Sequence, residues 1–89
     1  MELEGKERVK IYIENVSTVL NKLTEVKEGK VKTVVELCKR YLEDSRYYLE
    51  KGDVFTSLAC VSYAEGLLDA LRMLGLVSFE WPRKPVPLK

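Results

Sequence analysis

The chain has 89 residues, 46% of them hydrophobic and 33% charged, and its fifteen Lys and Arg nearly balance its fourteen Asp and Glu, leaving a formal net charge of +1. This length predicts one domain, or two at most, with a modest core, because so short a chain buries only about 60–65% of its unfolded surface. The composition excludes intrinsic disorder, which requires low hydrophobicity and high net charge. It also disfavours nucleic acid as a partner, since nucleic-acid binders usually carry a strong basic excess.

Much of the usual chemistry of active sites is missing from the sequence. It contains no His, the side chain that most often serves as a general base or metal ligand near neutral pH. The two cysteines, Cys38 and Cys60, do not have the spacing of a zinc site. We therefore expect no catalytic residues, no metal and no cofactor, and we expect that the protein is not an enzyme.

The sequence also bears on location. It has no uninterrupted run of about 18 apolar residues of the kind that spans a membrane. Residues 1–6 are charged and lack the apolar core of a signal peptide. We expect a cytoplasmic protein with no membrane partner.

Two segments show the three- and four-residue spacing of apolar side chains that is typical of amphipathic helices. They span about residues 3–26 and 30–51. The stripe of the first comprises Val9, Tyr12, Ile13, Val16, Val19, Leu20, Leu23 and Val26. The stripe of the second comprises Val31, Val34, Val35, Cys38, Tyr41, Leu42, Ser45, Tyr48 and Leu49.

A third helix is expected over about residues 54–74, between an N-cap at Asp53 and a terminating Gly75. Its apolar residues form two strips that surround most of the helix. One strip comprises Phe55, Ala59, Gly66, Ala70 and Met73, and the other comprises Cys60, Val61, Ala64, Leu67, Leu68, Leu71 and Leu74. Two neighbouring helices can cover about half of such a surface, so we expect the remainder to be covered by the C-terminal arm or by another molecule.

After the third helix the chain should be extended. Val77, Phe79 and Trp81 alternate with polar residues, and three prolines between residues 82 and 87 disfavour a helix. The sequence thus predicts an all-α, up-and-down three-helix bundle (residues 1–76) with an extended C-terminal arm (residues 77–89). The arm could dock on a partner through its proline-spaced basic end, or fold back over the third helix.

The short turn after the second helix makes the second and third helices antiparallel, with residues at one level having numbers that add up to about 104. The expected pairs are Leu49/Phe55, Ser45/Ala59, Leu42/Ser62 and Cys38/Gly66. The second and fourth pairs are small on both sides, which would let the backbones approach closely. The two cysteines are about 9 Å out of step along the helix axes, too far for a disulfide, so we expect two free thiols.

Residues 41–53 and 62–75 resemble a known family, most specifically in the run Ser-Tyr-Ala-Glu-Gly-Leu-Leu-Asp-Ala-Leu-Arg at 62–72. The chain is similar to the small archaeal proteins catalogued as domain of unknown function three-five-seven. This resemblance implies an archaeal source and a closed three-helix bundle, and it implies no activity. Some relatives accompany nucleotidyltransferase-like domains. The resemblance therefore suggests, as an alternative role, a small-ligand or nucleotide-binding accessory to a separate nucleotidyltransferase-like enzyme.

One polar line interrupts the apolar surface of the third helix. Glu65, Asp69 and Arg72 share one side at steps of four and three. The two carboxylates could hold a cation or act as an acid–base pair beside the Arg. They could also form a buried polar line against the first helix, but an ion-pair network within the helix is the interpretation that we favour.

Four further side chains are candidates for contact with a partner: Tyr47 on the polar face of the second helix, Leu68 on the third, and Phe79 and Trp81 in the arm. Together with the surplus apolar surface of the third helix, they favour a non-catalytic interaction module. Such a module would form a homo-oligomer or bind a protein partner through the third helix and the arm.

Overall fold

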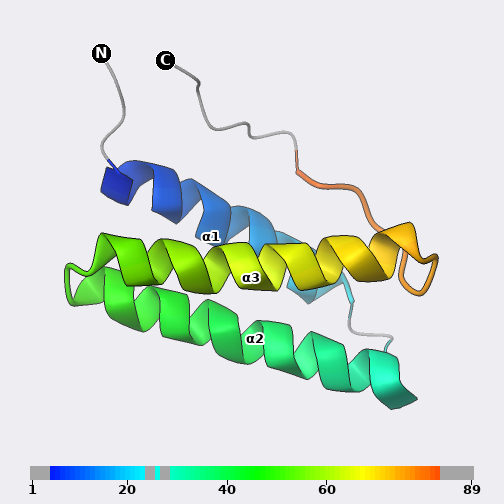
Figure 1. The fold of residues 1–89 in the computed structure, drawn as a ribbon. Helices are drawn as coiled ribbons and strands as arrows, with labels where there is room; N and C mark the ends of the chain where they lie inside the picture. The colour runs from blue at the N-terminus through cyan, green and yellow to red at the C-terminus, as the bar shows by residue number, and fades with distance from the viewer. Residues whose placement is uncertain (1–4, 24–25, 27–28, 83–89) are drawn as a thin grey trace.

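The structure, a computed structural model, describes residues 5–23, 26 and 29–82. Three helices, α1 (Gly5–Lys22), α2 (Gly29–Glu50) and α3 (Val54–Met73), run up, down and up, and the arm turns back from the end of α3 (Figure 1). No strand occurs in the described ranges. The expected all-α three-helix bundle is therefore confirmed.

The helix boundaries follow the expected capping signals, with one difference. Gly52 (φ 87°) and Gly75 (φ 76°) adopt the left-handed conformation that ends α2 and α3, and Asp53 Oδ1 accepts the Thr56 N–H at 3.1 Å. The first helix, expected to reach residue 26, stops at Lys22. After Lys22 the chain forms a tighter turn, in which the Leu23 N–H donates to the Leu20 carbonyl at 3.1 Å. The apolar pattern of the sequence therefore extends beyond the end of the helix.

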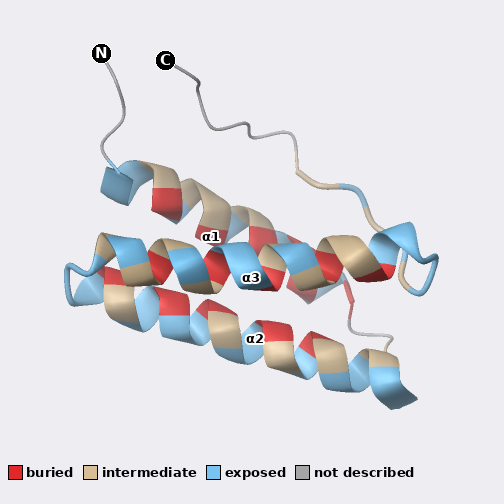
Figure 2. Ribbon diagram, in the orientation of Figure 1, coloured by how far each residue is buried: buried red, intermediate tan, exposed pale blue. Residues whose placement is uncertain are grey.

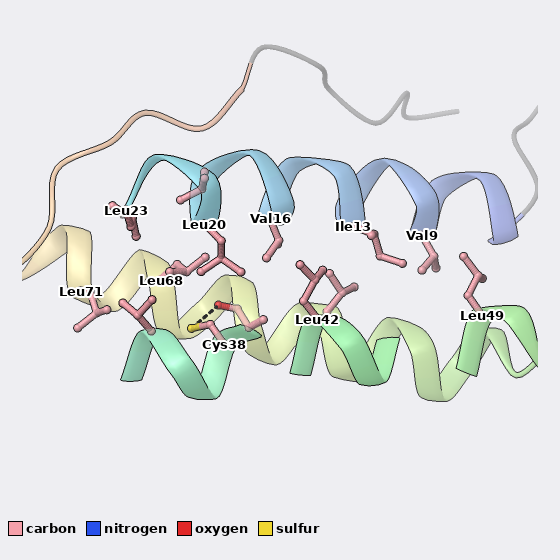
Figure 3. Packing of buried hydrophobic residues seen from close by; sticks show 14 residues of the cluster. Val9, Ile13, Val16, Leu20, Leu23, Cys38, Leu42, Leu49, Leu68 and Leu71 are labelled. Atoms are coloured by element: carbon pink, nitrogen blue, oxygen red, sulfur yellow. Dashed lines mark hydrogen bonds between the residues drawn. The ribbon is translucent and has the colours of Figure 1, made fainter. Parts of the chain in front are cut away.

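The core lies along the axis of the bundle and is built from one stripe of each helix (Figures 2 and 3). The expected stripes of α1 and α2 are confirmed. Their buried side chains are Val9, Ile13, Val16, Val19, Leu20 and Leu23 from the first segment, and Val35, Cys38, Leu42, Ser45 and Leu49 from the second. Removal of this apolar surface from water is the main force that holds the helices together.

The expected orientation of α3 is wrong. The helix turns a different stripe inward, namely Ser57, Val61, Ala64, Leu68 and Leu71. Phe55, Ala59, Ser62 and Gly66, which were expected to face α2, are exposed. Ser45 instead faces Ser57, and Cys38 faces Ala64. Two residues along a helix correspond to about 200° of rotation, so a shift of two in the pairing exchanges the inner and outer faces.

A reciprocal pair of hydroxyls fixes α2 against α3. The Ser45 Oγ–H donates to the Ser57 carbonyl at 2.8 Å, and the Ser57 Oγ–H donates to the Ser45 carbonyl at 2.7 Å. Both residues are fully buried, and the two hydroxyl oxygens are 3.0 Å apart. Only small side chains permit so close an approach of two backbones, so the expectation of small facing residues holds although their identity in α3 differs.

Both cysteines are free thiols, as expected. Cys38 is fully buried, and its Sγ–H donates to the Ala64 carbonyl at 3.7 Å (Figure 3). Burial raises the pKa of Cys38 to about 11, which keeps it protonated. Cys60 is partly exposed, and burial, followed by the charges of Asp44 and Asp53, raises its pKa as well. Neither thiol has the lowered pKa of a reactive cysteine.

The arm folds back onto the bundle. Val77, Phe79 and Trp81 pack against the core, whereas Ser78 and Glu80 are exposed. The rings of Phe79 and Trp81 meet edge to face with centroids 5.0 Å apart. Of the two expectations for the arm, folding back is confirmed for residues 77–82. The basic, proline-spaced end at residues 83–89 lies outside the described residues.

Candidate interaction surface

The polar line of α3 fastens the arm. Asp69 Oδ1 accepts the Arg72 Nε–H at 3.0 Å and an Arg72 Nη2–H at 2.7 Å. The same oxygen accepts the indole N–H of Trp81 at 3.0 Å. Of the three possibilities for this line, the structure thus shows an Asp69–Arg72 ion pair within the helix, and it adds a third partner from the arm. We call these three residues the arm clasp.

The electrostatics of the line match this role. The hydrogen bond from Trp81, followed by that from Arg72, lowers the pKa of Asp69. Partial burial, followed by the charge of Asp69, raises the pKa of Glu65. The ion pair of this line joins Arg72 Nη2 to Asp69 Oδ1 at 2.7 Å. Among the described residues, no group of three or more His, Cys, Asp or Glu lies close enough together to hold a metal ion.

Opposite its core stripe, α3 carries an exposed face without a single charge. Five residues at steps of four, three, four and seven form this face, which we call the α3 strip: Phe55, Ala59, Ser62, Gly66 and Met73. At 100° per residue all five fall within about 60° of one another around the helix. Phe55 is 86% exposed and Met73 70%, and Leu74, at 72%, extends the apolar surface past the helix end. Figure 2 shows exposed segments recurring along the whole of α3.

The candidate contact residues divide into three groups. Tyr47 is exposed on α2, where its ring meets that of Tyr48 and lies 5.4 Å from the Lys51 ammonium. Leu68 is fully buried in the core and adds nothing to the surface. Phe79 and Trp81 are half-buried, because the arm packs them against the core. None of the four belongs to the α3 strip. Four members of that strip, namely Phe55, Ala59, Ser62 and Gly66, had been expected to face α2.

A shallow groove of about 850 Å³ lies on another side of the bundle, between α1 and the end of α2. Its lining includes three basic side chains and two acidic ones: Lys6, Lys10, Arg46, Glu14 and Glu50. Arg46 is oriented by hydrogen bonds to Glu43 Oε2 at 2.6 Å and Ser17 Oγ at 3.3 Å. None of the candidate residues Glu65, Asp69, Arg72 and Tyr47 lines this groove.

In length and mean hydropathy (1.3), α3 also meets the requirement for a membrane-spanning helix, and within the described ranges it is the one helix that does. Glu65 and Asp69 interrupt its apolar sequence, as expected, while the small and apolar residues around these two carboxylates keep the mean high. The observation is weak by itself, since the central helix of a packed bundle meets the same requirement. It nevertheless shows how much of α3 resembles an interior surface.

The fold and its surface define a small three-helix bundle with a clasped C-terminal arm. The chain belongs to the family described as "Protein of unknown function (DUF357)", whose match covers residues 11–77. That range includes most of α1, all of α2 and α3, and the start of the arm. It contains Asp69 and Arg72 of the clasp, while Trp81 lies beyond it. No curated protein matches the chain.

Proposed function

We propose that the protein is a non-catalytic interaction module that associates with a second protein chain through the α3 strip. The single observation that carries this proposal is the exposure of large apolar side chains on an uncharged helix face, with Phe55 86% and Met73 70% exposed. Exposed helix faces of small domains usually carry interspersed charges, as do those of α1 and α2. Apolar side chains exposed on a helix face without interspersed charges favour a contact site.

The arm does not remove this surplus. It covers the side of α3 next to Asp69, where Trp81 is bonded, and leaves the strip in contact with water. Two neighbouring helices were expected to leave part of the apolar surface of α3 uncovered. The arm covers one side of that surface, and we propose that a partner chain covers the strip.

The test compares two variants that add the same charge at exposed positions. Gly66→Glu places a carboxylate in the middle of the strip, where a Cβ meets nothing within 4 Å, and Thr33→Glu places one on α2. Each full-length variant, tagged, is purified from the native cell and analysed by native mass spectrometry and sedimentation. Gly66→Glu should lose associations that Thr33→Glu and the wild type retain. Identical associations in all three would contradict the proposal.

A second candidate function is a small-ligand accessory to a nucleotidyltransferase-like enzyme. The groove between α1 and α2 supports it, because the basic residues of its lining, three against two glutamates, could attract a phosphate there. A thermal-shift screen of nucleotides tests it, since ligand at one hundred times its Kd should add about 2.7 kcal/mol of stability. A lack of any shift, or a shift unaffected by Lys10→Ala, would remove this candidate.

A further inference from the structure

We infer that the arm is a movable strap that regulates the α3 strip: residues 77–82 leave the bundle as one unit while the three helices stay folded, and the strip is then enlarged. This inference rests on the proposed function and adds a regulation of the same site. It begins with the core, which is complete without the arm. The buried hydrophobic residues of the described chain all lie between Val9 and Leu71. The helices should therefore keep their packing when the arm is released.

The arm is held by its side chains and not by its backbone. Within the described part of the chain, the backbone hydrogen bond nearest the C-terminus joins the Leu76 N–H to the Leu71 carbonyl at 2.9 Å. Beyond it, Val77, Phe79 and Trp81 pack against the core, and each of the three is only half-buried. A segment held in this way opens at a lower free energy than the helices on which it lies. The boundary between the fixed and the movable chain is therefore at Leu76.

The polar fastening of the arm can be released without leaving a charge unpaired. The indole N–H of Trp81 gives Asp69 Oδ1 one hydrogen bond, at 3.0 Å. Arg72 gives the same oxygen two, at 3.0 and 2.7 Å, and both of these lie within α3. When the arm leaves, Asp69 keeps its cation and the indole N–H meets water. Loss of a hydrogen bond is costly mainly when one partner stays buried and unsatisfied, and neither partner does so here.

The arm lies at the edge of the strip. Asp69 is seven positions from Ser62, so these two residues are about 20° apart around α3. Trp81 is bonded to Asp69, and the arm runs on the side of α3 that faces away from α2 (Figures 1 and 3). The side of α3 that the closed arm covers is therefore the direct neighbour of the strip. When the arm leaves, the two form one continuous surface.

The size of the strip gives this enlargement its importance. The strip extends about 27 Å along α3 and a helix is about 10 Å wide, which gives a footprint on the order of 300 Å². A standard interface buries about 800 Å² per partner. Aromatic side chains bury about 150–250 Å² each. An open arm exposes the rings of Phe79 and Trp81 and the side of α3 beneath them, which together supply most of the missing area. A partner that binds this larger surface selects the open state.

Hydrogen exchange of the purified full chain, followed by NMR at several low urea concentrations, tests the opening. Relative to the rate of each group in an unfolded chain, the indole N–H of Trp81 should exchange faster than the backbone N–H of Leu68, which lies in the buried stripe of α3. Its rate should also depend little on urea, because a local opening exposes little surface. If both protons show the same protection and the same dependence on urea, or if the indole shows no protection at all, the inference is overturned.

A dye measurement on full-length variants tests the enlargement. Asp69→Ser removes the acceptor of Trp81 and so opens the arm, and Asp44→Ser removes the same charge from an exposed position on α2. With equal helix content by circular dichroism, Asp69→Ser should bind roughly twofold more Nile red, an uncharged dye of apolar surfaces, because the uncovered area is comparable to the strip. Adding Gly66→Glu should remove this excess, whereas adding Thr33→Glu should not. Equal binding by the two Ser variants, or an excess that Gly66→Glu leaves intact, would overturn the inference.

Failure of the inference and failure of the proposed function remain distinguishable. The exchange and dye measurements use the purified chain alone, so they decide whether the arm opens and enlarges the strip whatever the partner is. The proposed function fails if Gly66→Glu keeps every association that the wild type shows in the native cell. Where Gly66→Glu does lose a partner, Asp69→Ser should bind more of that partner than Asp44→Ser does, and equal amounts would overturn the regulation while leaving the proposed function in place.

Discussion

Replacement of Gly66 by Ala should stabilise the folded chain, and the sign of this effect tests how α3 is oriented. Gly66 lies in the middle of α3 on its exposed face, and a Cβ added there meets nothing within 4 Å. Ala is favoured over Gly within a helix by about 0.8–1.0 kcal/mol. With no steric cost to offset this gain, the free energy of unfolding should rise by about 0.5–1 kcal/mol, and the Tm by roughly 2–8 °C.

The assay is urea unfolding followed by the fluorescence of Trp81, the only tryptophan. Tryptophan fluorescence is sensitive enough for submicromolar protein, and at that dilution the unfolding of the single chain is measured. If Gly66 instead faced Cys38, as sequence register alone suggests, the added methyl group would push α2 and α3 apart and cost about 1–3 kcal/mol. A loss of stability would therefore refute the orientation described above.

The same substitution at Gly52 provides the control. Gly52 has a φ of 87°, a conformation that costs an L-residue about 1–2 kcal/mol. Gly52→Ala should therefore destabilise the chain although its Cβ also meets open space. The two glycines separate the effect of backbone conformation from that of packing.

Three further predictions follow from the core and the arm. Ser57→Val should lower the free energy of unfolding by about 2–4 kcal/mol in thermal melts, because it overfills a fully buried position and removes a hydrogen bond; an unchanged Tm would contradict the close contact. Asp69→Ala should shift Trp81 emission to longer wavelength with helix content unchanged. Acidification of the wild type should do the same, because the lowered pKa of Asp69 means that the clasp is present at neutral pH and is lost as the pH falls through that pKa. An emission maximum that stays constant in both cases would exclude the clasp. Iodoacetamide should modify Cys60 in the native protein and Cys38 only after unfolding, as mass spectrometry of the labelled peptides can check; equal rates would show that the core opens readily.

The parts of the fold that the sequence predicted are those governed by local rules. The stripes of α1 and α2 are one-sided, so their periodicity alone identifies which residues face the core. Gly52 and Asp53 are a helix stop followed by an N-cap, a signal that needs no tertiary information. The alternation of Val77, Phe79 and Trp81 likewise predicted that one side of the arm would be covered.

The orientation of α3 could not be predicted in this way. When a helix is apolar nearly all round, periodicity does not say which side faces inward, and tertiary contacts decide. Here the decisive contact is the hydroxyl pair of Ser45 and Ser57, two small polar residues whose partnership is visible only when the helices are placed together. The candidate surface moved with that choice, because turning Ser57 inward turns Phe55 and Met73 outward.

The arm clasp depends on a similar long-range relation. Glu65, Asp69 and Arg72 were identified as a polar line, and the Asp69–Arg72 pair was one of the possibilities open for it. The third member, Trp81, lies twelve residues from Asp69 and reaches it only because the arm reverses direction after Gly75. A tryptophan expected to pack on the bundle, with an indole N–H in need of an acceptor, is the signal that could have indicated this contact.

The oxidation of Met73 by excess hydrogen peroxide, followed by peptide mass spectrometry of the purified chain and of the chain with the proteins that copurify with it from the native cell, tests the central claim most directly. Met73 is 70% exposed in the single chain and sits at the end of the α3 strip. Its thioether should be oxidised rapidly in the purified chain and more slowly where a partner chain covers the strip. Slow oxidation of the purified chain, or an equal rate with and without the copurified partners, would contradict the account.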